Sequence, residues 1–328
     1  MGDFLLSINC ITYNHEKYIA DAIESFLMQK TNFKYEILIH DDASTDKTAE
    51  IIRKYERQYP GLIKPIFQSE NQYSKGNGKR IIILNQERAL GQYIAFCEGD
   101  DYWTDPYKLQ KQVEILEGDH SLAASFHKVE EVTTNKKKKG TYIEVPYLKS
   151  NNKYDIYDII RFDGRKIHLS SLVFRKEFFN TSNIPDFFYD SVVGDLPMML
   201  ILATRGEFYY FSDSMSCTRR DVPNGASQRL FKGTESFINS NNKIMECYNR
   251  FNEFTEFVYS DYIKEVLTYR EFLNYEKKGN YSLVKNSEYF KNSNTLNKLK
   301  IWLRCNFPIV YTELGYIKER LRLLRMNK

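Results

Sequence analysis

Nine residues decide how this chain is interpreted: Tyr93 to Asp101, with the sequence YIAFCEGDD. The first five residues are apolar and predict a buried strand, which runs directly into three carboxylates and a glycine. Carboxylate oxygens are hard ligands for a divalent cation, and a glycine lets a ligand approach the backbone closely. Such a cation can neutralise a diphosphate. The alternative is an acidic turn that caps a helix starting near Asp105-Pro106.

Two earlier predicted strands also end in polar residues. Residues 4–11 end at Thr12-Tyr13-Asn14, and residues 35–39 end at Asp41-Asp42-Ala43-Ser44. An apolar pattern of helical spacing follows each of them. In an open, mostly parallel sheet, ligands bind outside the carboxyl ends of the strands, so the three ends together outline a nucleotide pocket. Taken singly, Asn14, Ser44 and Asp46 are also suitable helix caps.

The order and spacing of these motifs resemble the inverting family 2 glycosyltransferases with the GT-A fold, particularly bacterial enzymes of surface-polysaccharide assembly. The resemblance covers roughly residues 4–220 and also rests on Tyr102-Trp103 and Gly194-Asp195. It implies an α/β fold in which a single Rossmann-like mixed sheet is flanked by helices. A helical C-terminal appendage follows this domain.

The resemblance implies how a nucleotide would be held. Tyr13 would lie against the base, between Thr12 and Asn14, and Asp42 would accept a hydrogen bond from the imide of the base. This arrangement suits a uracil- or thymine-type base. Arg80 is a further candidate, because arginine is a natural partner of phosphate, although a solvated basic loop explains it as well.

The resemblance also assigns the acidic residues that follow the strand at 93–97. Asp100 would face the ribose and diphosphate, and Asp101 would be the firmer ligand of a divalent cation, Mn²⁺ or Mg²⁺. Glu98 occupies a position where the family more often has Asp, and it is the third candidate ligand.

The acceptor half of the predicted site lies after position 105. Asp195 comes just before a strongly apolar helix at 196–203, so it is either the cap of that helix or, as the resemblance implies, the general base. Trp103 and His168 are candidate residues of the acceptor or diphosphate side, and the alternative for His168 is a structural histidine with satisfied hydrogen bonds. Arg219 and Arg220 precede a loop at 221–233 and suit a lid that stabilises a departing diphosphate, or simple surface contacts.

The resemblance, together with the change to a helical, aromatic-rich sequence after about position 233, divides the chain into three parts. Residues 1–220 form the predicted catalytic domain, with a nucleotide-sugar half to about 105 and an acceptor half from about 106; a flexible loop at 221–233 and a helical region at 234–328 follow. Residues 298–328 hold eight basic residues against two acidic ones. An amphipathic helix of this kind either lies on an anionic membrane surface or docks on its own protein.

Composition excludes several classes of protein. The five cysteines are odd in number and widely spaced, which argues against a disulfide framework or a zinc site. Neither a signal peptide nor an apolar run of about 20 residues is present, so the sequence predicts a cytoplasmic protein, peripheral at most to the inner face of the membrane. The basic run at 136–139 is too short to indicate nucleic-acid binding.

Together these features predict an inverting, metal-assisted transfer of a sugar from a nucleotide-diphosphate donor to a hydroxyl of a glycan or lipid-linked glycan. One alternative is a sugar nucleotidyltransferase, but the glycine-rich, arginine-bearing loop that it needs does not follow the first strand. Another is a non-catalytic binding module, which we would expect to lack acids at 100, 101 and 195. A dehydrogenase is disfavoured because no G-x-G-x-x-G follows a strand.

Overall fold

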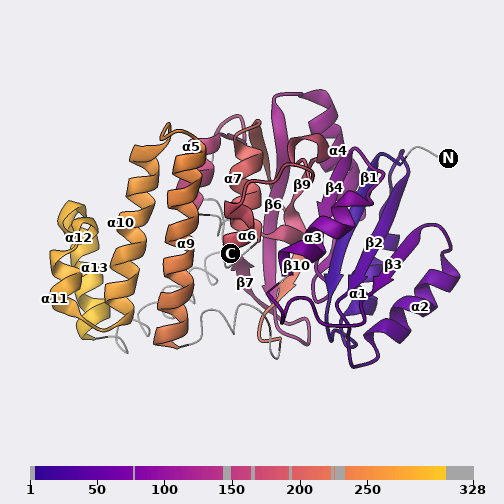
Figure 1. The fold of residues 1–328 in the computed structure, drawn as a ribbon, viewed down its shortest axis with the longest axis horizontal. Helices are drawn as coiled ribbons and strands as arrows, with labels where there is room; N and C mark the ends of the chain where they lie inside the picture. Colours follow the sequence, from indigo (N-terminus) through magenta and orange to yellow (C-terminus); the bar gives the residue numbers. More distant parts are fainter. Residues whose placement is uncertain are drawn as a thin grey trace, which may run out of the picture.

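The structure is a computed structural model that describes residues 4–76, 78–142, 149–163, 167–191, 194–222, 225 and 233–307. Within these residues, one mixed sheet of ten strands forms the centre of the molecule (Figure 1). Its main path runs in the order β3 (Ile63–Phe67), β2 (Tyr35–Asp41), β1 (Leu6–Thr12), β4 (Tyr93–Phe96), β9 (Val173–Arg175), β6 (Leu122–Val132), β10 (Glu207–Arg219), β5 (Tyr102–Trp103). Two more strands lie off this path: β7 (Lys138–Tyr142) pairs with β6, and β8 (Lys153–Tyr154) pairs with β10.

The first four strands are parallel and end at one edge of the sheet. In their register Thr12 lies beside Asp41, and Asn9 lies beside Phe96. Strand β9 runs antiparallel to both β4 and β6, and β5 runs antiparallel to β10, so the sheet is mixed as predicted. The polar residues that follow β1, β2 and β4 therefore meet at the same edge.

Helices cover both faces of the sheet and bury its two apolar surfaces. One face carries α1 (Ile19–Leu27), α2 (Thr48–Gln58) and α4 (Lys108–Gly118). The other carries α3 (Gly78–Glu87), α5 (Ile156–Phe162), α6 (Phe187–Asp190) and α7 (Asp195–Ala203). Helix α1 shows why these helices pack on the sheet. Its apolar residues Ile19, Ile23 and Phe26 recur at helical spacing, so they share one face, and all three are completely buried. The predicted three-layer α/β arrangement is confirmed.

Five helices follow the sheet and form the helical extension, defined here as residues 234–306: α9 (Thr234–Phe254), α10 (Ser260–Lys277), α11 (Tyr281–Asn286), α12 (Glu288–Asn292) and α13 (Thr295–Asn306). They line up at one end of the molecule in Figure 1. Tyr248 and Phe251 of α9 and Ile263 of α10 belong to the same hydrophobic core as α5 and α7. The first two helices of the extension are thus part of the main core, whereas α11–α13 pack on a small separate cluster around Phe272.

Local boundaries differ from expectation in three places. Helix α1 begins at Ile19, so Asn14 is not its cap; Asn14 has a positive φ of 55° and lies in the preceding turn. The segment at 167–175 has the sequence pattern of a single strand, but it forms a 3₁₀ turn (Leu169–Ser171) followed by the short β9. The basic segment expected from 298 begins inside α13, and residues 308–328 lie outside the described part of the chain, as does most of the loop at 221–233.

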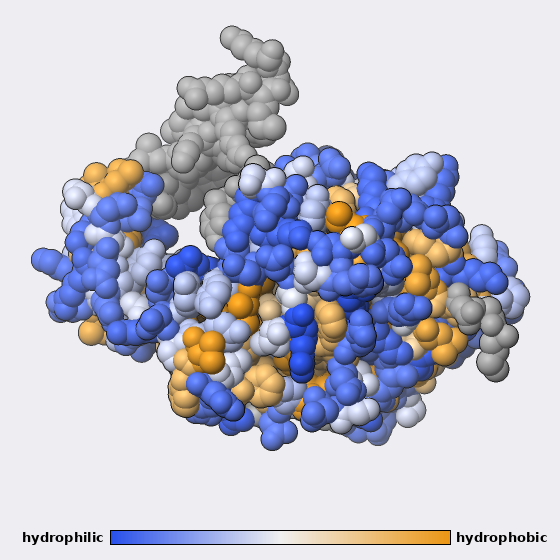
Figure 2. Space-filling view, turned by 90° about the horizontal axis from the view of Figure 1, so that it is seen from above, coloured by the Kyte–Doolittle hydropathy of each residue, from blue (hydrophilic) through white to orange (hydrophobic). Residues whose placement is uncertain are grey.

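The surface of the described residues includes some large hydrophobic side chains. Seen from above, it is mostly hydrophilic, with separate hydrophobic areas (Figure 2). Among the described helices, none combines the length and the apolar character needed to cross a bilayer. The five cysteines are unpaired, and four of them are buried.

Candidate active site

The candidate active site lies where β1, β2 and β4 end. The chain leaving β4 stays paired to β1, because Cys97 N–H donates to the Asn9 carbonyl (3.2 Å) and Gly99 N–H donates to the Ile11 carbonyl (2.9 Å). The acidic turn, defined as residues 98–101, is therefore held against the last residue of β1. A Cβ atom on Gly99 would lie only 2.5 Å from the Thr12 hydroxyl oxygen, so the turn needs glycine at this position.

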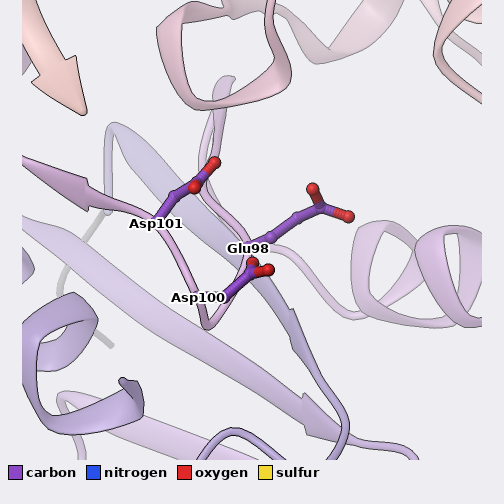
Figure 3. A group of neighbouring side chains, drawn as sticks. All are labelled: Glu98, Asp100 and Asp101. Atoms are coloured by element: carbon purple, nitrogen blue, oxygen red, sulfur yellow. The ribbon is translucent and has the colours of Figure 1, made fainter. Parts of the chain in front are cut away.

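Three carboxylates project from the acidic turn (Figure 3). One oxygen each of Glu98, Asp100 and Asp101 lies within 4.8 Å of the others. The turn is closed by a hydrogen bond from Asp101 N–H to the Glu98 carbonyl (3.1 Å). The side chains range from exposed at Glu98 to buried at Asp101, so the group opens to solvent on one side. This oxygen-only set fits a hard divalent cation such as Mg²⁺ or Mn²⁺.

The charges of this group oppose one another in the absence of a cation. Although the Glu98 residue as a whole is exposed, desolvation, followed by the charges of Asp100 and Asp195, raises the pKa of its carboxyl group above the usual value. Desolvation, followed by the charges of Asp100 and Glu98, raises the pKa of Asp101 well above its usual value. A carboxylate cluster that resists ionisation on its own is stabilised by a bound cation, which agrees with the fit of the ligand set.

Neighbouring groups orient the two aspartates. Asp101 Oδ1 accepts a hydrogen bond from the backbone N–H of Arg219 (3.1 Å), and its Oδ2 lies 3.7 Å from His168 Nδ1. Asp100 Oδ2 lies 3.8 Å from His15 Nε2. Each aspartate of the turn thus has a fixed neighbour on another element.

The three residues that follow β1 differ in exposure. Thr12 is buried, and its hydroxyl lies 3.2 Å from His15 Nδ1. Tyr13 is 39% exposed and can offer its ring to a ligand. Asn14 uses its side-chain carbonyl to accept a hydrogen bond from Thr45 N–H (2.8 Å), so it joins the β1 turn to the β2 turn.

Asp42 follows β2 and is 1% exposed. Its two carboxylate oxygens accept hydrogen bonds from the backbone N–H groups of Gln72 (2.8 Å) and Tyr73 (3.0 Å). The next residue, Ala43, has a positive φ of 61°, an uncommon conformation for alanine. Asp42 therefore holds the segment after β3 against the end of β2.

The structure does not bring Arg80 and Trp103 to the acidic turn. Arg80 lies exposed in the first turn of α3, where its nearest acidic partner is Glu87 (3.6 Å). Trp103 is 2% exposed, and its indole N–H donates to the Ser170 carbonyl (2.9 Å) inside the core. The buried position of Trp103 leaves no exposed ring for a ligand, whereas Arg80 has an exposed side chain.

On the acceptor side, Asp195 is the first residue of α7 and not its cap, which is Gly194. Its carboxylate accepts a hydrogen bond from Leu196 N–H (2.9 Å), and burial raises its pKa. The charge of Asp195 contributes to the raised pKa of Glu98, so the two carboxylates are near enough to interact electrostatically. His168 Nδ1 accepts from Ser170 N–H (3.2 Å), and burial, followed by the charge of Arg220, lowers the pKa of His168 to about 3, so the imidazole is neutral.

The two arginines at the end of β10 have different partners. Arg219 is almost completely buried and pairs with Asp21 of α1. Arg220 pairs with Glu131 of β6, with 2.7 Å between its Nε and the carboxylate. Both guanidinium groups thus have acidic partners, and only that of Arg219 is buried; the Arg220 side chain is 35% exposed.

Two contributors to this region, His15 and Asp21, were not predicted as site residues. His15 lies in the loop after β1 and contacts both Thr12 and Asp100. The only feature of the sequence that could have indicated a role for His15 in the site is its position three residues after Thr12. Asp21 resembles any acidic residue in the first turn of a helix, so the sequence contains no signal for its contact with Arg219.

The chain was compared with known families and proteins. The family model described as "Glycosyl transferase family 2" matches residues 7–179. An uncharacterized Mycobacterium bovis protein is 45% identical over 124 residues, which cover 38% of this chain and 35% of the relative. The Escherichia coli UDP-Glc:alpha-D-GlcNAc-diphosphoundecaprenol beta-1,3-glucosyltransferase WfaP is 40% identical over 114 residues, covering 34% of this chain and 41% of the relative. The chain thus matches less than half the length of these curated relatives.

Solved structures share the fold at low sequence identity. S. aureus TarS in complex with UDP-GlcNAc aligns with a TM-score of 0.56 and 16% identity, over 92% of this chain and 79% of that chain. The mannosyltransferase PcManGT from Pyrobaculum calidifontis, in complex with GDP-Man and Mn²⁺, aligns with a TM-score of 0.56 and 14% identity, over 96% and 84%. These alignments confirm the predicted GT-A fold.

Proposed function

This chain belongs to glycosyl transferase family 2, and from that premise we propose that it is an inverting glycosyltransferase that depends on a divalent cation. The donor is a nucleotide-diphosphate sugar, for which a UDP-sugar fits best. The acceptor is a hydroxyl of a glycan or of a lipid-linked glycan. WfaP, whose printed name contains both UDP-Glc and a diphosphoundecaprenol acceptor, supports both choices.

The acidic turn is the observation that carries the proposal. Its three carboxylates converge within 4.8 Å beside the ends of the parallel strands, where α/β folds bind their ligands. Asp101 and Asp100 would hold the cation, and Glu98 would complete the set from the open side. When bound, the cation supplies positive charge to the diphosphate leaving group.

The nucleotide would lie across the ends of β1 and β2. Tyr13 has the exposed ring needed to lie against a base. Asp42 is 1% exposed and already accepts two backbone hydrogen bonds, so the segment at 72–73 would have to shift for the carboxylate to accept one from a uracil imide as well. In this proposal Asp42 both receives the base and fixes the segment at 72–73 beside it, with Thr12 and Asn14 supporting the same edge.

Asp195 would act as the general base. Burial raises its pKa, which makes it a better proton acceptor near neutral pH than an ordinary aspartate. As Asp195 takes the proton of the acceptor hydroxyl, the acceptor oxygen forms a bond to the anomeric carbon of the donor sugar. The bond from that carbon to the diphosphate oxygen breaks with its electron pair, so the configuration inverts.

The helical extension suggests where such an enzyme works. Leu296, Leu299 and Trp302 of α13 are 60%, 52% and 39% exposed, and Lys300 lies on the same helix. We propose that α13 and the basic residues beyond it lie on an anionic membrane surface, beside a lipid-linked acceptor. This would make the protein a peripheral enzyme at the cytoplasmic side of the membrane.

Thermal stabilisation by nucleotide sugars tests the proposed function. We expect UDP-sugars with Mn²⁺ to raise the melting temperature in proportion to the logarithm of ligand concentration over Kd, and EDTA to remove the effect. Asp101→Asn should abolish transfer and the metal-dependent part of the shift, because the amide keeps the shape but loses the charge.

Asp213→Asn is the matched control, since Asp213 is an exposed acid on β10. It should behave as the wild-type protein does. Because Asp101 is buried, Asp100→Asn provides a second test at a half-buried ligand. Wild-type turnover in both ligand variants would overturn the metal assignment, and a protein that responds to no nucleotide sugar would overturn the function.

A further inference from the structure

Arg219, the last residue of β10, makes four kinds of contact around the acidic turn. Its side chain is 1% exposed. One guanidinium nitrogen donates to the Asp100 carbonyl, and another forms an ion pair with Asp21 of α1. Its backbone N–H donates to the Asp101 carboxylate (3.1 Å). A single residue thus holds the backbone of one candidate ligand and the carboxylate of the next.

Aromatic rings fix the guanidinium between two elements. Its central carbon lies 5.0 Å from the ring centroid of Tyr18, just before α1, and 4.7 Å from that of Tyr102 on β5. Cation–π contacts of this kind are favourable, and a desolvated one more so. The guanidinium therefore occupies a defined position beside the acidic turn and cannot rotate freely.

We propose that Arg219 is a positioning residue that locks the acidic turn into the geometry needed for cation binding, and that Asp21 holds Arg219 in place. This inference rests on the proposed function, because it concerns the same turn. It replaces the expectation of a lid residue for Arg219, since the side chain is buried and both terminal nitrogens of its guanidinium already have partners, Asp100 and Asp21.

The physical argument is about preorganisation. One oxygen of each carboxylate of the turn lies within 4.8 Å of the others, so like charges oppose one another before a cation binds and favour opening of the turn. A buried guanidinium that binds the Asp100 carbonyl opposes that opening without occupying the carboxylate oxygens of Asp100. Groups that orient metal ligands in this indirect way typically change metal affinity by about 10–100-fold when they are removed.

Two neighbouring basic residues provide matched controls. Arg220 is adjacent in sequence, but its guanidinium pairs with Glu131 of β6 and not with Asp21. Lys136 shares Asp21 with Arg219 (2.8 Å) and lies 5.3 Å from the Tyr102 ring centroid. No contact of Lys136 with the acidic turn is present among the described residues. Loss of either charge alters the local electrostatics while sparing the proposed lock.

Hydrogen exchange of the metal-free protein tests the lock directly. We expect faster exchange of the amides of residues 99–101 in Arg219→Gln and Asp21→Ala, and wild-type exchange there in Arg220→Gln and Lys136→Gln. Wild-type exchange of the turn in Arg219→Gln would overturn the inference. If Arg219→Gln does not fold, Asp21→Ala decides in the same way, because Asp21 is only partly buried.

Titration with Mn²⁺, followed by the electron paramagnetic resonance signal of the free ion, tests the consequence. We expect a Kd about 10–100-fold weaker in Arg219→Gln, and within twofold of wild type in Arg220→Gln. Equal affinities in these two variants would overturn the role in cation binding. A wild-type protein that binds no Mn²⁺ would instead overturn the metal part of the proposed function, and the exchange experiment would still decide whether the lock exists.

Discussion

The sheet edge and the helical extension handle buried charge in opposite ways. At the edge, Glu98, Asp100 and Asp101 lie together, and their mutual repulsion contributes to the raised pKa values of Glu98 and Asp101. In the extension, Arg270 is also buried, but it donates two hydrogen bonds to Asp163 at the end of α5 and one to Asn241 of α9.

The difference shows which region is built for stability and which for binding. A buried charge with complete hydrogen bonding fixes helices in place. A group of like charges lowers stability unless something from outside neutralises it. Arg270 joins α10 to α5 and α9, and so attaches the extension to the main domain. In the acidic turn, in contrast, the carboxylates repel one another, and a bound cation would relieve this repulsion.

The largest effect on stability should come from breaking the paired charge. Asp163→Asn keeps the shape and tolerates the positive φ of 57° but leaves Arg270 buried without a counter-charge. We expect a loss of about 3–5 kcal/mol of unfolding free energy, measured by urea denaturation. Glu265→Gln is the control, because its pair with Arg161 joins the same two helices at the surface. It should cost less than about 1 kcal/mol. Equal losses in the two variants would contradict the contrast between the regions.

At the sheet edge, removing a charge should cost activity and spare stability. Asp195→Asn can still accept the hydrogen bond from Leu196 but cannot take a proton. We expect transfer to fall by at least about 10²-fold while donor binding by calorimetry and the melting temperature stay at or above wild-type values. Asp186→Asn, a change at an exposed acid in the same half of the chain, should have no effect. Retained transfer, or an unfolded variant, would indicate a structural role for Asp195.

A third test concerns Lys108, which is completely buried below the edge. Burial lowers its pKa from 10.5 to about 7. Between these values the unfolded chain binds more protons than the folded one, so this residue makes stability rise as pH increases from about 7 to 10.5. Urea denaturation at pH 7 and pH 9 should show that Lys108→Met removes this increase and is more stable at pH 7. Lys111→Met, at a partly exposed lysine of the same helix, should leave the increase intact.

The smallest effect per residue is expected for membrane binding by the basic residues at the C-terminal end of the chain. Each basic residue near an anionic surface contributes about 1 kcal/mol, so salt should release the protein. We expect co-sedimentation with phosphatidylserine-containing vesicles, but not with neutral ones, at low ionic strength. A truncated protein that ends at Phe307 tests the contribution of the basic residues after it. An earlier end would disturb the small hydrophobic cluster in which Ile301 of α13 packs. Leu299→Gln in the full chain tests the apolar contribution. Unchanged sedimentation of the truncated protein would show that the segment binds elsewhere.

The sequence by itself determined the framework of the fold. Apolar runs that end in polar residues predicted β1, β2 and β4, and apolar residues at helical spacing predicted α1 and α7. These signals are local, because the period of side chains along a strand or helix is fixed by the backbone. The three acids of the turn were also predictable as a group, since four consecutive positions of one turn cannot lie far apart.

Only the tertiary structure decided the partners of the remaining site candidates. Tyr102 and Trp103 are adjacent on β5, but successive side chains of a strand point to opposite faces, so one meets Arg219 and the other enters the core. The pairing of Arg219 with Asp21 spans 198 positions. It follows from the place of β10 in the sheet and from the packing of α1. The spacing of residues along the chain predicts neither the position of β10 in the sheet nor the packing of α1, because both depend on contacts between elements that are far apart in the sequence.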